Sequence, residues 1–76
     1  ERDVINIDGE GNYYIGDKLA TEDEVLAHLQ VKFEDYPPLQ IYLRADQNTP
    51  TKKIREFVEM ATAVGAIDLI FGVHGN

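Results

Sequence analysis

Apolar and polar residues alternate in several short stretches of the chain, a pattern typical of strands with one buried face. Strands are predicted at Val4–Asp8 and Tyr13–Ile15, on either side of a glycine-rich turn that joins them as a hairpin. A second turn leads into a short strand at Leu19–Ala20. The clearest alternation lies in residues 39–43 and 67–73, which predicts two further strands.

Apolar residues at intervals of three and four predict two helices between these strands. The first begins at Thr21, whose hydroxyl can form a capping box with Glu24, and it ends before a Pro-Pro pair. The second has Thr49 as its predicted N-cap and Pro50 at its first helical position. Gly65 follows the last apolar residue of this stripe and is the predicted C-terminal stop.

The predicted order of elements is β-β-(β)-α-β-α-β, which indicates an α/β, or α+β, fold. Residues 39–73 form one β-α-β unit, so their two strands are expected to be parallel with a right-handed crossover. Both helices then pack on one face of a mixed sheet, as a two-layer sandwich whose other face is open to water or a partner. The 76 residues are enough for a single domain, 1–76.

The charge of the chain is strongly acidic, with a net value of −7. Residues 1–38 carry 10 acidic and 3 basic side chains, whereas residues 39–76 carry 4 of each. This balance argues against nucleic acid and against an anionic membrane surface as partners. No apolar run approaches the roughly 18 residues of a membrane span. We expect a soluble part of a longer protein, so that any membrane anchor would lie outside this sequence.

Catalytic chemistry has few residues to use. The chain has neither serine nor cysteine, so neither can serve as a nucleophile, and His28 and His74 are predicted at the surface. Glu24 and His28 are four residues apart on a helix and could hold a metal, but the capping box explains Glu24 better. The calcium-loop-like stretch that begins at Asp8 lacks the glycine and the glutamate that such a loop requires. We expect no enzyme activity, no metal and no cofactor.

The last predicted strand is the first candidate for a binding surface, because it is apolar and nearly uncharged. At the edge of the sheet it would invite strand addition by a partner or a second copy. The alternative is a central strand that is paired on both sides. The candidate partner-binding residues in this strand are Ile67, Leu69, Ile70, Phe71 and Val73.

A cationic spot is the second candidate. Lys52, Lys53 and Arg55 crowd the first turns of the second helix, where positive charge opposes the helix dipole, and Arg44 precedes them in the loop. Together they could form a local cationic binding spot on an acidic domain. The alternative is a solvated helix face whose charges are balanced by nearby glutamates.

Several motifs in series carry a resemblance to a known family. They are Ile7-Asp8 with Gly11 and Tyr13-Tyr14-Ile15, residues 21–29, Leu43-Arg44-Ala45-Asp46, Ala63-Val64-Gly65-Ala66 and residues 67–73. In this order and spacing, the chain resembles the soluble periplasmic domain of the ExbD/TolR family of biopolymer transport proteins. Within the family pattern, Arg44 and Asp46 join the last strand as candidate partner-binding residues.

The resemblance implies a function in transport driven by the proton motive force. ExbD/TolR proteins have one N-terminal inner-membrane helix with a proton-handling Asp, which is absent from this sequence. Their membrane part dimerises inside a ring of ExbB/TolQ-like subunits. The periplasmic domains form homodimers, sometimes with exchanged strands, and contact a TonB-like or TolA-like protein or the peptidoglycan.

The family pattern is broken at one position. A tyrosine often follows the proline after the Arg-Ala-Asp segment, whereas Pro50 is followed here by Thr51. Two alternatives therefore stay open. One is an ExbD-like domain that transmits motion to a TonB-like partner. The other is a TolR-like domain that anchors to peptidoglycan, with Lys52, Lys53 and Arg55 as the candidate cell-wall-binding residues.

Overall fold

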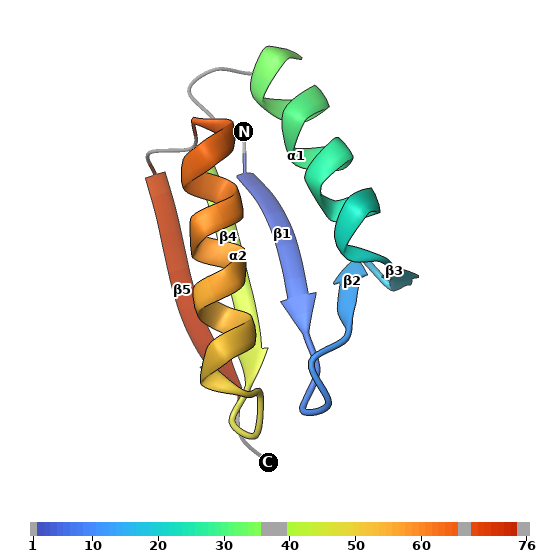
Figure 1. The fold of residues 1–76 in the computed structure, drawn as a ribbon, viewed down its shortest axis with the longest axis vertical. Coiled ribbons are helices and arrows are strands. Elements are labelled where there is room, and N and C mark those ends of the chain that lie inside the picture. Colours follow the sequence, from blue (N-terminus) through green and yellow to red (C-terminus); the bar gives the residue numbers. More distant parts are fainter. Residues whose placement is uncertain (1, 36–39, 66–67, 75–76) are drawn as a thin grey trace.

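The computed structural model describes residues 2–35, 40–65 and 68–74 of the chain. Figure 1 shows seven elements in the order predicted from sequence, including the short third strand. They are β1 (Arg2–Ile7), β2 (Tyr13–Ile15), β3 (Lys18–Ala20), α1 (Glu22–Asp35), β4 (Gln40–Asp46), α2 (Thr51–Val64) and β5 (Asp68–His74). The predicted α/β class is confirmed.

The five strands form one mixed sheet in the order β3-β2-β1-β4-β5. The two hairpins, β1–β2 and β2–β3, are antiparallel. β4 lies parallel to both of its neighbours, with Leu43 opposite Ile5 on one side and opposite Phe71 on the other. The predicted parallel pairing of the last two strands is thus confirmed, and the first strand lies beside them (Figure 1).

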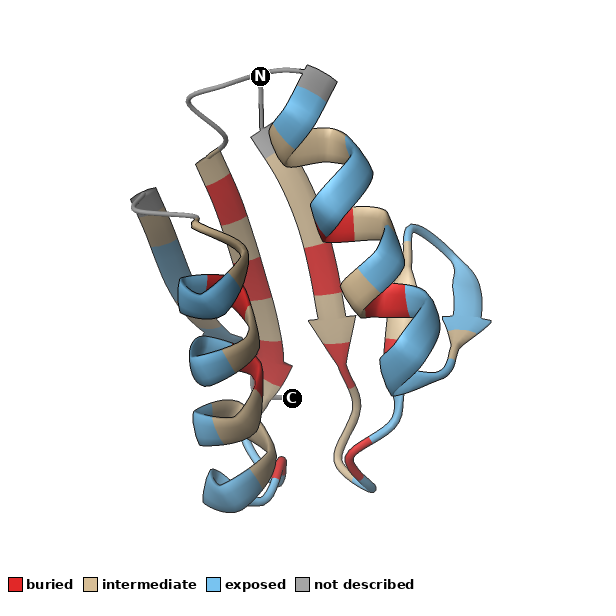
Figure 2. Cartoon of the chain, turned by 45° about the horizontal axis from the view of Figure 1, so that its top comes forward, coloured by how far each residue is buried: buried red, intermediate tan, exposed pale blue. Residues whose placement is uncertain are grey.

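The core lies between the sheet and the two helices. Along β4 the residues alternate strictly between buried and partly exposed positions, so only one face of this strand is covered. Figure 2 shows the buried residues on the inner stripes of the helices and on alternate strand positions. The largest fully buried side chains are Phe57, Ile5, Ile7, Leu29, Ile41, Leu43 and Val25.

The first helix begins as its sequence predicts. The amide of Thr21 donates to the Glu24 carboxylate at 2.8 Å, and the amide of Glu24 donates to the Thr21 hydroxyl at 3.1 Å. The capping box is therefore confirmed, and it satisfies two backbone donors that a helix start leaves without intrahelical partners.

The start of the second helix differs from its prediction. The N-cap of α2 is Pro50, which makes no side-chain capping bond, and the helix begins at Thr51. The Thr49 hydroxyl instead donates to the carbonyls of Ile7 and Asp8, at 3.2 and 2.9 Å. The prediction of Thr49 as N-cap is wrong because its side chain turns inward to the end of β1. The predicted stop at Gly65 is confirmed, since this residue caps α2 with a φ of 105°.

Candidate partner-binding surface

β5 forms one edge of the sheet. Within residues 2–35, 40–65 and 68–74, β5 pairs with β4 alone, so its other side has no neighbouring strand. Of the two alternatives left open by the sequence, the structure places this strand at the edge and not at the centre. Such an edge presents backbone N–H and C=O groups that can pair with another strand.

The side chains of β5 alternate between the two faces of the sheet. The parallel register with β4 puts Leu69, Phe71 and Val73 on the face that the helices cover. Leu69 packs against the core, but Phe71 is 47% exposed and Val73 is 61% exposed. The helix layer therefore leaves the outer part of this face open. Ile67, which was predicted with these residues, lies outside the described part of the chain.

The opposite face of β5 carries Ile70 and Gly72. Ile70 is exposed, and the hydroxyl of Tyr42 on β4 crosses over Gly72. A Cβ at position 72 would lie only 2.6 Å from that hydroxyl oxygen, so the approach of Tyr42 requires glycine there. Arg44 is the register partner of Gly72, which places this predicted site residue beside β5 on the open face.

Val58 on α2 extends the apolar surface. Met60 and Ala63 lie on the flank of α2 toward α1, where residues of the two helices line one hollow. Helical spacing puts Val58 on the opposite flank, which Figures 1 and 2 show next to β5. Val58 is exposed too. We call the surface formed by these exposed apolar side chains the β5 edge surface; its members are Val58, Ile70, Phe71 and Val73.

Asp46, another predicted site residue, is engaged in the turn after β4. Its carboxylate accepts a hydrogen bond from the amide of Asn48 at 2.8 Å, and its carbonyl accepts one from the amide of Thr49 at 3.0 Å. Gly9 lies close against the same carboxylate. Asp46 therefore shapes the connection to α2 at the carboxyl end of the strand.

The predicted cationic residues do not form one cluster. Lys53 turns inward, with Nζ 5.8 Å from the centre of the Tyr13 ring and 3.8 Å from a carboxylate oxygen of Glu56. Lys52 and Arg55 are exposed and, three residues apart, share an outer face of α2. Arg44 projects from the other side of the sheet, opposite the helix layer. This dispersal favours the β5 edge surface over the cationic spot as the binding site.

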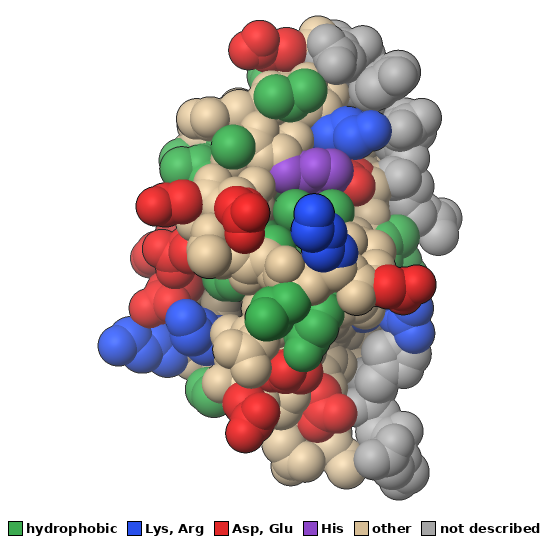
Figure 3. All heavy atoms as spheres, turned by 90° about the vertical axis from the view of Figure 1, so that its right-hand side faces the viewer, with side chains coloured by type: hydrophobic (Ala, Val, Ile, Leu, Met, Phe, Trp, Pro, Cys, Tyr) green, Lys and Arg blue, Asp and Glu red, His purple; other side chains and the backbone are tan. Residues whose placement is uncertain are grey.

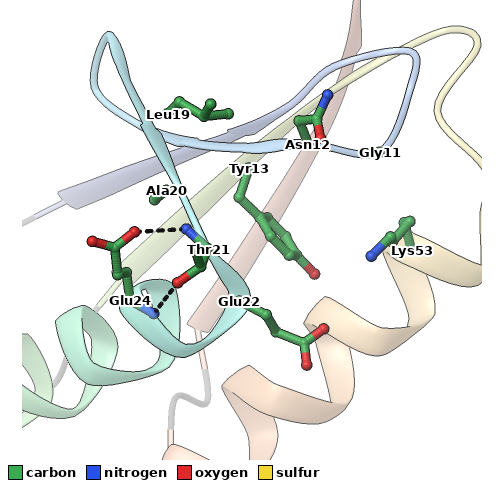
Figure 4. A pocket seen from close by; sticks show the side chains of 9 residues that line it. All are labelled: Gly11, Asn12, Tyr13, Leu19, Ala20, Thr21, Glu22, Glu24 and Lys53. Atoms are coloured by element: carbon green, nitrogen blue, oxygen red, sulfur yellow. Dashed lines mark hydrogen bonds between the residues drawn. The ribbon is translucent and has the colours of Figure 1, made fainter.

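Tyr13 lines a hollow of about 350 Å³ between the hairpin and the starts of both helices. In Figure 4 its ring points between Glu22 and Lys53, beside the capping box of α1. Its hydroxyl is shielded from solvent without a hydrogen-bond partner among the described residues. Burial raises the pKa of Tyr13 to about 12, and the charges of Glu22 and Glu56 add to the effect. The phenol therefore stays protonated near neutral pH.

Asp8 organises the turn between β1 and β2, a role that sequence reasoning missed. Its carboxylate accepts hydrogen bonds from the amides of Glu10 and Asn12, the side chain of Asn12 and the hydroxyl of Tyr14, at 2.9–3.2 Å. Partial burial alone would raise the pKa of Asp8, but these hydrogen bonds outweigh it and hold the pKa below its usual value. Both oxygens of Asp8 thus serve the turn itself.

His28 was predicted at the surface, but it is partly buried against β1. Its Nε2 lies 2.8 Å from a carboxylate oxygen of Asp3, and both of these atoms are shielded from solvent. His28 is thus at the surface only in part: it flanks the core-facing stripe of α1 and reaches Asp3, which shares a strand face with Ile5. The side chain of the second histidine, His74, lies outside the described part of the chain.

The described residues contain neither a metal-binding cluster nor a membrane-spanning helix. No group of three or more His, Cys, Asp or Glu side chains there could hold a metal ion. No helix among the same residues is long and apolar enough to cross a membrane. Comparison of the sequence with protein-family models and with curated proteins finds no match.

Proposed function

We propose that this chain is the partner-binding domain of an ExbD-like energy-transducing protein. It pairs with a second copy through β5 and transmits motion to a TonB-like partner for transport across the outer membrane. The observation that carries the proposal is the outer edge of β5, which no other strand among the described residues pairs with and which has exposed apolar side chains on both faces of the sheet. The family resemblance described above supplies the biological setting.

A second copy of the chain fits this edge. In an antiparallel pairing centred on Phe71, the apolar Leu69 of each copy faces Val73 of the other. Residues 69–73 carry no charge, so the pairing brings no like charges together although each chain is strongly acidic. The two five-stranded sheets would then join into one continuous sheet.

The sheet also offers a path for force. The family resemblance puts the membrane helix before residue 1, so that motion enters the domain at β1. β1 is paired in parallel with β4 over six residue positions, and β4 with β5 over seven. These ladders of backbone hydrogen bonds connect the point of entry with the binding edge. A pull on β1 is therefore transmitted to β5 through the hydrogen bonds of the sheet, and the helices are not needed for this transmission.

Mass measurements at increasing protein concentration test the pairing. We expect the wild type to dimerise and Val73→Lys to stay monomeric, because the lysine would place a charge against the apolar Leu69 of the other copy. Leu19→Lys is the matched control, since Leu19 is 62% exposed on the opposite edge strand, β3, against 61% for Val73. A monomeric wild type, or equal loss of dimer in both variants, would contradict pairing through β5.

A peptide with the sequence of residues 68–74 tests whether the same edge accepts a separate strand. We expect it to compete with dimerisation and to shift the backbone amide signals of β5. If only the signals of β3 changed, the peptide would bind at the opposite edge of the sheet, and this would contradict a binding edge at β5.

A further inference from the structure

A groove runs between α1 and α2, on the side of α2 away from the β5 edge surface. Two hollows lie along it, of about 440 and 400 Å³, and both are lined by Ala63. They reach from the first turn of α1, at Glu22, to its last turn, at Glu34. The groove therefore follows most of the length of the first helix.

The groove combines an apolar floor with carboxylates of a single sign. Its apolar lining residues are Leu26, Phe33, Met60, Ala63 and Val64. Its charged lining residues are all acidic: Glu22, Asp23, Glu34, Glu56 and Glu59. Neither hollow has a lysine or arginine among its described lining residues.

Helix stability accounts for only some of these charges. Glu22 and Asp23 lie in the first turn of α1, where a carboxylate favours the helix dipole. Glu34 lies in the last turn of the same helix, where a carboxylate opposes the dipole. Glu59 lies in the middle of α2, far from either end. Glu56 is partly balanced by Lys53, 3.8 Å away. The placement of Glu34 and Glu59 therefore calls for another explanation.

We propose that the α1–α2 groove binds a basic amphipathic helix of a partner protein. The apolar side chains of that helix would pack on the floor, at spacings of three and four residues, while its Lys and Arg side chains face the carboxylates. Figure 3, which faces the α1 side of the molecule, shows acidic and basic side chains interspersed with hydrophobic patches on that side. This surface is separate from β5, so it can be occupied in the monomer and in the dimer.

Charge selects this occupant over two others. A second copy of the chain has a net charge of −7, so its net charge opposes its approach to the acidic groove. An anionic lipid surface is repelled for the same reason. A cationic helix alone matches both the apolar floor and the sign of the rim.

The test uses a synthetic amphipathic helix of 14 residues, the length of α1 and α2, with leucines on one face and lysines on the other. We expect saturable NMR shifts at the side chains of Leu26, Phe33 and Met60, and weaker binding at higher salt because the attraction is screened. The same peptide with glutamates in place of lysines should not bind. Shifts confined to β5, or equal binding of both peptides, would overturn the proposal.

Two matched pairs of variants locate the site. Glu59→Lys should weaken binding of the lysine peptide about tenfold, whereas Glu10→Lys, in the exposed turn after β1, should change it less than about twofold. Ala63→Arg places a bulky cation in the groove and should abolish binding, while Thr62→Arg adds the same side chain on another face of α2. Equal effects within either pair would show general attraction to an acidic protein and refute a specific groove.

Discussion

The hydroxyl of Thr49 joins the end of β1 to the start of α2, and its removal has a predictable cost. Thr49 is only 8% exposed, and its single proton is shared between the carbonyls of Ile7 and Asp8. Thr49→Val keeps the shape but leaves both carbonyls without this donor. A net hydrogen bond contributes about 1 kcal/mol, and the Asp8 carbonyl keeps the amide of Gly11 as a donor, so the expected loss is about 1 kcal/mol. For a domain of this size, that lowers Tm by about 4–8 °C.

Thr49→Asp distinguishes this contact from an N-cap. At an N-cap, aspartate is at least as good as threonine. Here its carboxylate would face two carbonyl oxygens in a buried position, so we expect a loss larger than that of Thr49→Val. Thr49→Ser keeps the donor and should cost least. Urea unfolding followed by far-UV circular dichroism measures all three. Wild-type stability in Thr49→Asp would refute the account of this junction.

Two predictions concern pH. Tyr13 has its pKa raised to about 12, from about 10 in an unfolded chain. The stability that this shift contributes is therefore complete below about pH 10 and is lost as the pH rises toward 12. The urea midpoint should fall over this range, and less so in Tyr13→Phe. An equal fall in both proteins would contradict Tyr13 as the source of the loss. Asp8 has its pKa lowered, so its contribution is present above about pH 4 and is lost as the pH falls. Asp8→Asn should cost about 1 kcal/mol at neutral pH, a modest value because the turn is open to solvent, and should flatten the acid limb of the stability curve. An unchanged acid limb would show that Asp8 is not its source.

Features set by neighbouring residues could be predicted from the sequence. The capping box of Thr21 and Glu24 and the stop at Gly65 depend on short spacings and on backbone preferences. The Thr49-Pro50 pair matches the local sequence pattern of a helix start with threonine as N-cap. In the structure, however, Pro50 is the N-cap and the Thr49 hydroxyl donates to the carbonyls of Ile7 and Asp8. The carbonyls that attract Thr49 come from β1, about 40 residues earlier in the chain. No local pattern contains that contact.

The candidate site depended on the arrangement of the sheet. The apolar alternation of residues 67–73 predicted a strand, and the β-α-β order predicted that it lies parallel to β4. Whether another strand covers its outer side depends on the position of the first hairpin, which lies on the far side of β1. In the same way, the inward turn of Lys53 depends on the distance between α2 and Tyr13, and not on the charges around it in sequence.

Amide hydrogen exchange in β5 tests the central proposal most directly. The amides that point away from β4 should exchange rapidly in dilute protein, because no strand in the described part of the chain pairs with them, and should become protected as the concentration rises. The amides of β3, at the other edge, serve as an internal reference and should not change. Protection of β5 that is independent of concentration and of the 68–74 peptide would contradict a partner-binding edge in this strand.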